Sequence, residues 1–90
     1  MSERSPEQRF EAILNALANT KPDPSHPTFQ VLAAGPLEDL LGAHGAVLIE
    51  RVEVEARRNP AFNLLLGGVW QNEISKEVWA RIQAARLKVW

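Results

Sequence analysis

The stretch AAGPLEDLLGAHGAVLIERVEVEARRNP, residues 33–60, decides how this chain folds. Its Gly-Pro pair at residues 35–36 is typical of one helix ending at glycine and the next beginning at proline. Glu38 and Asp39 then fall in the first turn of the new helix, where carboxylates favour the positive end of the helix dipole. Gly45 is placed to end this helix, and its buried face is formed by Leu37, Leu40 and Leu41. We therefore predict a sharp reversal at the Gly-Pro pair that packs this short helix against the preceding one.

The second part of the same stretch, residues 46–58, carries both a strand pattern and a helix pattern. Valine alternates with glutamate over residues 52–55, which is typical of a half-buried strand. The opposing pattern is a helical stripe formed by Leu48, Ile49, Val52 and Ala56. Glu53 also lies four residues before Arg57, in the order that stabilises a helix. Because the rest of the chain offers no clear partner strand, the periodicity favours a helix, with the strand as the alternative.

Before this stretch, two helix starts are recognisable. Ser5-Pro6 followed by Gln8 forms a capping box, which predicts a helix over residues 6–19. A proline-rich loop at residues 20–27 cannot continue that helix. Pro27 can then open a second, short helix that we expect to end at Gly35.

After the stretch, the same signals repeat. Asn59-Pro60 starts a short helix that Gly67-Gly68 ends, and Ser75 caps a last helix over residues 76–88. The whole chain, residues 1–90, therefore predicts a single all-α domain of about six helices, three of them short. The repeated stop-then-proline units favour either a compact irregular bundle or a HEAT-like packing of helix pairs.

Composition narrows the class of protein. The chain has 90 residues and no cysteine, which excludes a disulfide framework, a thiolate zinc site and a cysteine nucleophile. Residues 1–50 carry three basic and seven acidic side chains, whereas residues 51–90 carry seven basic and four acidic ones. With a pI near 6.1, the chain lacks the basic footprint of a nucleic-acid-binding protein. We see neither a signal peptide nor an apolar run near the roughly 18 residues of a membrane span, and expect a cytoplasmic protein.

Motifs of known chemistry are missing from the sequence, so we expect neither catalysis nor a cofactor. His44 fits the last turn of its helix, where an imidazolium meets the negative end of the dipole; a general base is the alternative. His26 and Asp23 supply too few donors for a structural zinc site. Glu38 and Asp39 point about 100° apart on a helix, and therefore do not converge as an acid–base pair.

Three tryptophans, in a chain without tyrosine, are the strongest candidates for a binding surface. Trp79 fits the core, packed against the residue before the helix cap in a hydrophobic staple. Trp70 follows two glycines, and we favour burial over exposure for it. Trp90 is equally consistent with docking and with exposure. An exposed Trp90 would form a patch with Arg81 and Arg86, because tryptophan and arginine are preferred interface anchors.

Four blocks run in order along the chain: AAGPLEDLL followed by HG, ERVEVEARRNP-x-F, LLGGVW and VWARIQAAR. In these blocks, over about residues 31–86, the chain resembles a family of small bacterial domains known only as a domain of unknown function. The resemblance implies a cytoplasmic helical protein and supplies no activity. Most family-typical positions are helix ends, turns and core, but three are polar exceptions: His44, Arg51 and Glu55. We expect these three to form one buried network that fixes the turn, or a candidate site if they are exposed.

The functional hypothesis is a non-enzymatic module that binds another protein in a bacterial cytoplasm, in an accessory or regulatory role. The tryptophan surplus and the charge asymmetry, without catalytic residues, favour it. The alternative is an inhibitor, of the toxin-immunity or phage anti-defence type, that masks an effector such as a nuclease. Its acidic binding face would include Glu3, Glu7, Glu11 and Asp23. A homodimer remains open, and we expect no direct contact with nucleic acid or membrane.

Overall fold

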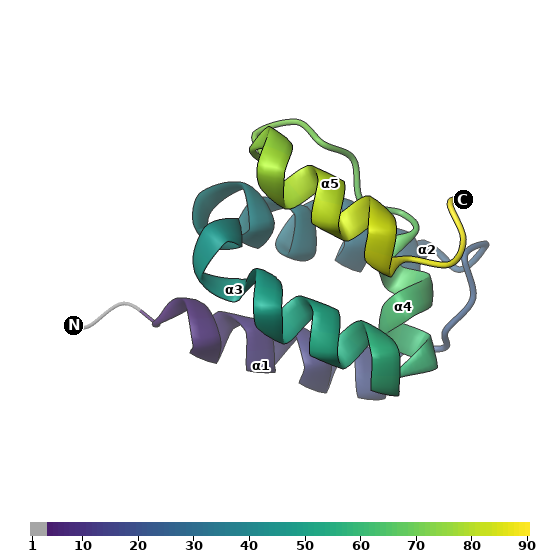
Figure 1. Cartoon of the computed structure of the whole chain (residues 1–90). Coiled ribbons are helices and arrows are strands. Elements are labelled where there is room, and N and C mark those ends of the chain that lie inside the picture. The colour runs from purple at the N-terminus through teal and green to yellow at the C-terminus, as the bar shows by residue number, and fades with distance from the viewer. Residues whose placement is uncertain (1–3) are drawn as a thin grey trace.

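The computed structural model describes residues 4–90 and contains helices and no strand over those residues (Figure 1). The elements in chain order are α1 (Pro6–Ala18), α2 (Pro27–Leu32), η1 (Ala33–Leu37), α3 (Glu38–Arg58), α4 (Pro60–Leu66) and α5 (Lys76–Ala85). The all-α prediction is confirmed. Residues 46–58 are helical, so the strand alternative for this segment is wrong.

The elements α2, η1 and α3 are continuous, so the described residues form four helical segments instead of about six. The predicted helix end at Gly35 and new start at Pro36 are wrong, because the chain forms the π-helical turn η1 there. A π turn interrupts the regular hydrogen-bond ladder and so tolerates a proline that has no N–H to donate. No glycine among the described residues has the positive φ of a glycine helix stop. The apolar stripe that stays buried across this turn is Ala33, Leu37 and Leu40.

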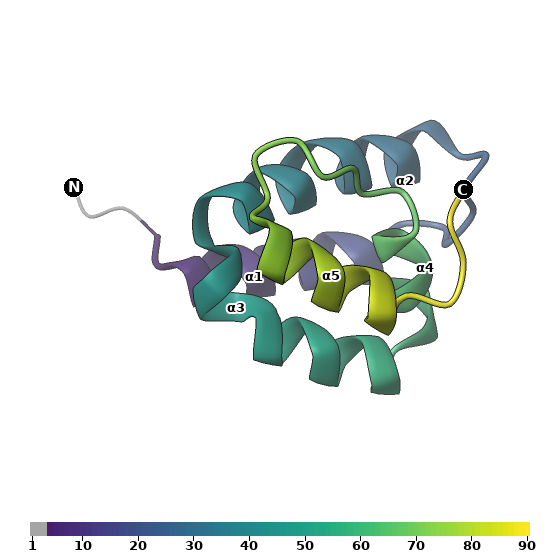
Figure 2. The same ribbon diagram turned by 45° about the horizontal axis from the view of Figure 1, so that its top comes forward.

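The chain reverses at His44, inside α3. His44 has a φ of −137° and a ψ of 21°, which are not helical. Figure 2 shows the chain running one way through α2, η1 and the start of α3, then back through the rest of α3. A Cβ atom on Gly45 would lie 2.9 Å from Val78 Cγ1, so glycine at the bend lets α5 pack closely. The predicted helix end at Gly45 therefore falls beside the real bend.

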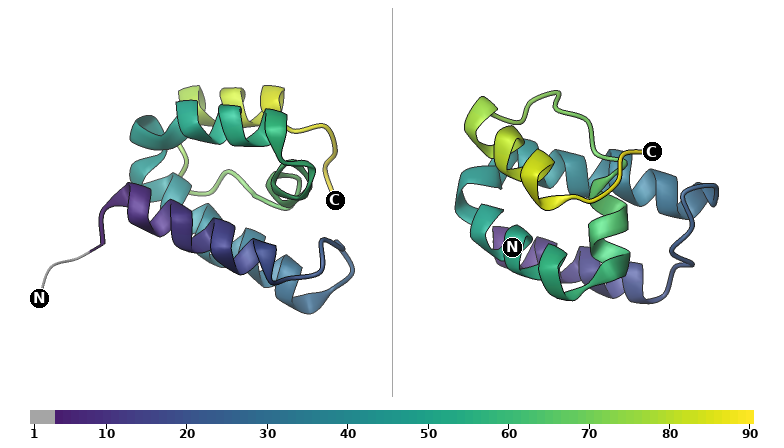
Figure 3. Two further views of the ribbon diagram at one scale, coloured as in Figure 1. Left: turned by 90° about the horizontal axis from the view of Figure 1, so that it is seen from below. Right: turned by 45° about the vertical axis from the view of Figure 1, so that its right-hand side comes forward.

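The helices lie in two layers, which the left view of Figure 3 separates. One layer holds α1 and the segment that runs from α2 into α3, and the other holds the rest of α3 beside α5. The short helix α4 is seen nearly end-on and contacts α1, α2 and α3 at one end of the layers. The HEAT-like packing is not confirmed by this arrangement.

The predicted helix starts are confirmed at three caps. Ser5 Oγ accepts from Gln8 N at 3.1 Å, and Ser5 N donates to Gln8 Oε1 at 2.9 Å, which completes the capping box of α1. Asn59 Oδ1 accepts from Phe62 N at 3.2 Å and caps α4. Ser75 Oγ accepts from Val78 N at 3.3 Å and caps α5. The predicted end of the last helix at residue 88 is wrong, since α5 ends at Ala85 and extended backbone follows.

The core lies between the two layers and is closed by α4. Phe10 of α1 and Phe62 of α4 meet edge to face, with ring centroids 5.5 Å apart. Fully buried residues from the other elements complete it, among them Phe29, Leu40, Leu48, Leu65 and Ile82. The predicted apolar faces of residues 37–41 and 48–56 are confirmed, because all their named positions are buried.

By length and composition alone, the continuous segment Pro27–Arg58 is long and apolar enough to cross a membrane. From the sequence, in contrast, we expect no apolar run near that length. It bends at His44, and Leu37 and Leu48, on either side of the bend, are completely buried in the core. Core helices of globular proteins pass the same length and composition test. The segment fits that description here.

Candidate interaction surface

Trp90 is docked onto the domain rather than exposed. Its backbone N donates to Gly67 O at 3.1 Å, and its indole Nε1 donates to Leu64 O at 2.6 Å. The indole ring also lies beside Phe29, with centroids 5.5 Å apart. A Cβ atom on Gly68 would lie 2.3 Å from that ring. The two glycines therefore let residues 86–90 pass closely across the end of α4, which is a structural role.

Arg81 and Arg86 do not form a patch with Trp90. Arg86 Nη1 donates to Val69 O at 3.1 Å, and its guanidinium lies 4.9 Å from the centre of the Trp79 ring. Burial lowers the pKa of Arg86 from its ordinary value. Arg81 instead donates twice to Glu53 on α3, at 2.9 and 2.6 Å. This pairing raises the pKa of Arg81 and lowers that of Glu53. Because α5 ends before Arg86, the helical spacing that would align the three side chains is lost.

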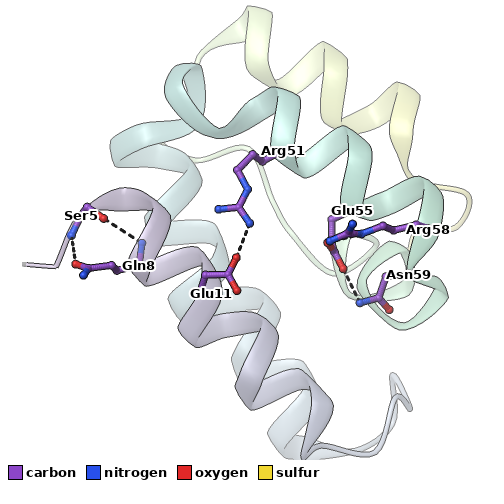
Figure 4. Close-up of polar contacts among 7 residues, drawn as sticks. All are labelled: Ser5, Gln8, Glu11, Arg51, Glu55, Arg58 and Asn59. Carbon is purple, nitrogen blue, oxygen red and sulfur yellow. Dashed lines mark hydrogen bonds and ion pairs between the residues drawn. The ribbon is translucent and has the colours of Figure 1, made fainter.

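The predicted network of His44, Arg51 and Glu55 does not form. Arg51 and Glu55 have different partners (Figure 4). Arg51 pairs with Glu11 on α1, and its guanidinium lies 5.0 Å from the centre of the Phe10 ring. Glu55 is buried and accepts hydrogen bonds from Arg58 and Asn59. His44 sits half-buried at the bend and has no side-chain hydrogen bond within residues 4–90. Helix α3 turns Arg51 and Glu55 toward different neighbours, so each supports its own contact.

The acidic face predicted on the N-terminal half is partly neutralised. Glu11 is paired with Arg51, and Glu7 lines a hollow that also contains Arg4. Asp23 Oδ1 accepts from Ser25 N at 2.9 Å, which holds the loop and lowers the pKa of Asp23. Glu3 lies outside the described residues. Residues 4–90 contain no group of three or more side chains that could hold a metal ion.

Trp70 is the tryptophan that the structure leaves open, with 70% of its surface exposed. Sequence reasoning favoured burial for Trp70, and the structure contradicts it. Its backbone N donates to Glu38 Oε1 at 2.8 Å, while Asn72 Nδ2 donates to the other oxygen of the same carboxylate. Asn72 has a φ of 40°, the left-handed region that asparagine tolerates better than most residues. Glu38 of α3 therefore clamps the loop that presents Trp70.

A hollow of about 440 Å³ lies beside this clamp, between α3 and the loop that joins α4 to α5. Its lining residues are Glu38, Asp39, Gly42, Ala43, Asn72 and Glu73. A Cβ atom on Gly42 would lie 3.1 Å from Glu73 Cβ, so the glycine allows the loop to approach α3. We call Trp70 and the three carboxylates that line this hollow, Glu38, Asp39 and Glu73, the Trp70 surface. Glu38 connects its two parts, because it binds the backbone of Trp70 and also lines the hollow.

The Trp70 surface was missed by sequence reasoning for a specific reason. Glu38 and Asp39 diverge on their helix, as the sequence analysis states, but the tertiary fold adds Glu73 from a distant loop. Glu73 and Asn72 carry no motif that singles them out. The surface offers an aromatic ring and three carboxylates, without a nucleophile paired to a base in its lining.

Fold and surface together define a small all-helical domain that presents one aromatic side chain beside clustered carboxylates. The chain belongs to the family of unknown function DUF6869, whose family model matches residues 1–89. This confirms the expected membership of an uncharacterised family and extends it beyond residues 31–86. No curated protein matches the chain, and no solved structure matches it.

Proposed function

We propose that this domain is a non-enzymatic module that binds another protein through the Trp70 surface. The observation that carries the proposal is Trp70 itself, 70% exposed while its backbone is fixed by Glu38. Tryptophan is among the residues that contribute most binding energy at protein interfaces. A side chain held in place before binding loses less conformational freedom when the partner arrives. Trp70 therefore has both the chemistry and the preorganisation of an interface anchor.

Other exposed apolar residues are weaker candidates for the anchor. Single exposed aliphatic side chains are normal on soluble domains, and Val31, Val47 and Leu87 are of this kind. Neither these residues nor Trp70 lines the 440 Å³ hollow, but the backbone N of Trp70 donates to Glu38, which does. This favours Trp70 over the patch of Arg81, Arg86 and Trp90, whose side chains already have partners within the domain.

An accessory or regulatory role in a bacterial cytoplasm is part of this proposal. The absence of cysteine from the sequence is compatible with a reducing compartment. A second candidate is an inhibitor, of the immunity or anti-defence type, that masks a basic effector such as a nuclease. The carboxylates of Glu38, Asp39 and Glu73 favour it, since they gather around one hollow and Glu38 also binds the backbone of the proposed anchor. Glu7 and Glu11 support it less, because Glu11 is engaged by Arg51.

The test is a comparison of three immobilised proteins: the wild type, Trp70→Ala and Leu87→Ala. Leu87 is 91% exposed and serves as the matched apolar control. We expect a protein from a lysate of the source organism to bind the wild type and Leu87→Ala, and to be lost from Trp70→Ala. Calorimetry with that partner, once purified, should give a defined stoichiometry and about 30-fold or greater weakening by Trp70→Ala. Equal affinity of the purified partner for all three proteins would contradict the proposal.

A further inference from the structure

We infer that the partner presents a basic segment to the Trp70 surface and places one lysine or arginine side chain in the hollow beside α3. This inference rests on the proposed function and names the chemistry of the partner. The Trp70 surface combines an aromatic anchor with three carboxylates, so the charge of these carboxylates decides which partner can bind beside the ring.

The charges around the hollow are of one sign. Three of its six lining residues are acidic, and none is lysine, arginine or histidine. Glu38 already accepts two hydrogen bonds from the loop, whereas within residues 4–90 Asp39 and Glu73 accept none through their carboxylates. Both of these residues are exposed. Two carboxylates at the anchor are therefore available to a cation from outside.

Glu73 is the carboxylate that commits this surface to a basic partner. Asp39 also lines a neighbouring hollow of about 310 Å³ that contains Arg4 and Arg9, so its charge is shared between two environments. Glu73 lines the acidic hollow and a second one that also contains His44 and Val78. An arginine or lysine near Glu73 would gain charge-assisted hydrogen bonds, which are stronger than neutral ones. A carboxylate from a partner would be repelled at the same place.

The size of the hollow fits a side chain of this kind, and so does the exposed ring of Trp70, whose backbone is bonded to Glu38 in the wall of the hollow. Its volume of about 440 Å³ is within the usual range of roughly 300–1,000 Å³ for ligand pockets. Trp70 offers an exposed indole, the aromatic side chain that attracts cations best. Long basic side chains also carry an apolar stem that covers such a ring. One basic segment can thus contact the ring with an apolar stem or a cationic group, and donate hydrogen bonds to the carboxylates.

Other occupants fit less well. A nucleic acid would bring phosphates against three carboxylates, which opposes binding. A bound metal ion would need more ligands than the described residues gather at any place. A second copy of the chain carries a net charge of −1, so it offers the hollow less complementary charge than a basic segment does. A basic segment from another protein remains the best match.

The test is a selection of displayed random peptides on immobilised wild-type protein, with removal of those that bind Trp70→Ala. We expect the selected peptides to be enriched in arginine or lysine. The best synthetic peptide is then measured by calorimetry against Asp39→Asn/Glu73→Gln, which removes both charges and keeps the side-chain shapes. The control is Glu7→Gln/Glu50→Gln, which removes the same charge at exposed sites outside the hollow.

We expect the Asp39→Asn/Glu73→Gln protein to bind about five- to tenfold more weakly, and the control to match the wild type. Added salt should weaken wild-type binding and have less effect on the Asp39→Asn/Glu73→Gln protein. Trp70-dependent peptides that are acidic or uncharged would overturn the inference of a basic segment. An unchanged affinity of Asp39→Asn/Glu73→Gln would overturn it too. Both outcomes leave the proposed function standing. A selection that yields no Trp70-dependent peptide also overturns the basic segment, while partner capture decides the proposed function separately. Peptides that bind Trp70→Ala as well as wild type would count against both.

Discussion

At the scale of single residues, Glu55 shows how one buried carboxylate joins two helices. Glu55 Oε1 accepts from Arg58 Nε at 3.1 Å and Nη2 at 2.8 Å, and Oε2 accepts from Asn59 Nδ2 at 2.9 Å. Asn59 in turn caps α4 through Phe62 N. The carboxylate therefore orients the residue that ends α3 and starts α4. A buried charge of this kind is tolerated only because its oxygens are satisfied.

We predict that Glu55→Ala lowers the free energy of unfolding by about 2 kcal/mol, because hydrogen bonds to a charged group are lost and Asn59 is released. Glu55→Gln should cost less, since the amide oxygen still accepts. Urea unfolding followed by circular dichroism measures both. Glu50→Ala, at an exposed position on the same helix, is the control and should change little. Equal effects of Glu55→Ala and Glu50→Ala would show that the joint contributes nothing.

The sequence spacing is consistent with the observed partners of Glu55. The predicted network of Glu55 with His44 and Arg51 is wrong. Residues three and four positions apart on a helix are neighbours, so Arg58 and Asn59 were within reach by spacing alone. Arg51 is also four residues away, yet it faces Glu11 because α1 packs on that side. His44 stands at the bend, where helical spacing no longer applies. Choosing among neighbours at similar spacing requires the tertiary fold.

At the scale of helices and turns, the sequence predicted the starts well and the reversal poorly. The caps at Ser5, Asn59 and Ser75 depend on contacts within three residues, which the sequence displays directly. The reversal at His44 depends on what α3 buries on each side of the bend. A Gly-Pro pair has strong local preferences, but burial of the flanking apolar residues kept that helix continuous at Gly35-Pro36.

Two glycine substitutions separate local conformation from close packing. A Cβ atom on Gly35 meets nothing within 4 Å, whereas one on Gly68 lies 2.3 Å from the Trp90 ring. We predict that Gly35→Ala changes the free energy of unfolding by less than about 1 kcal/mol, because the smaller loss of backbone freedom for alanine is opposed by crowding of its Cβ against the following Pro36. Gly68→Ala should destabilise it by about 1–3 kcal/mol through overpacking and displace Trp90. Urea unfolding gives both values, and the NMR signal of the Trp90 indole N–H reports the displacement.

The two substitutions control for each other, since each adds one methyl group to a glycine. A stabilising Gly68→Ala would contradict the close passage of residues 86–90 across the end of α4. A Gly35→Ala protein destabilised as much as Gly68→Ala would mean that the π turn η1 does not tolerate a side chain there.

At the scale of the whole molecule, the fold assigns opposite environments to two similar tryptophans. Trp70 and Trp90 both lie outside helices, and both are close to the glycine pair, one in sequence and one in space. The glycines accommodate the ring of Trp90, which contacts α2 and α4, whereas Trp70, whose backbone N donates to Glu38, is exposed. The sequence shows the two glycines, but it does not show whether Trp70 or Trp90 packs against them. That choice follows from the path of residues 86–90.

The same arrangement predicts how ionic quenchers reach the tryptophans. Trp70 should account for most of the quenchable fluorescence, because Trp79 and Trp90 are only partly exposed. We expect the carboxylates of the Trp70 surface to create a negative local potential, which concentrates cations and excludes anions. At low ionic strength we expect caesium to quench Trp70 about two- to fivefold more than iodide, each normalised to free N-acetyltryptophanamide. The contribution of Trp70 is the difference between wild type and Trp70→Phe.

The preference for caesium should shrink in Asp39→Asn/Glu73→Gln and persist in Glu7→Gln/Glu50→Gln, because only the first protein loses charges at the hollow. It should also shrink as salt shortens the range of the field toward the roughly 10 Å expected near 0.1 M. Equal normalised quenching by both ions would mean that the potential at Trp70 is neutral. In that case the ring would still be an exposed anchor, but the carboxylates of the Trp70 surface would exert too little field to select a basic partner over a neutral one.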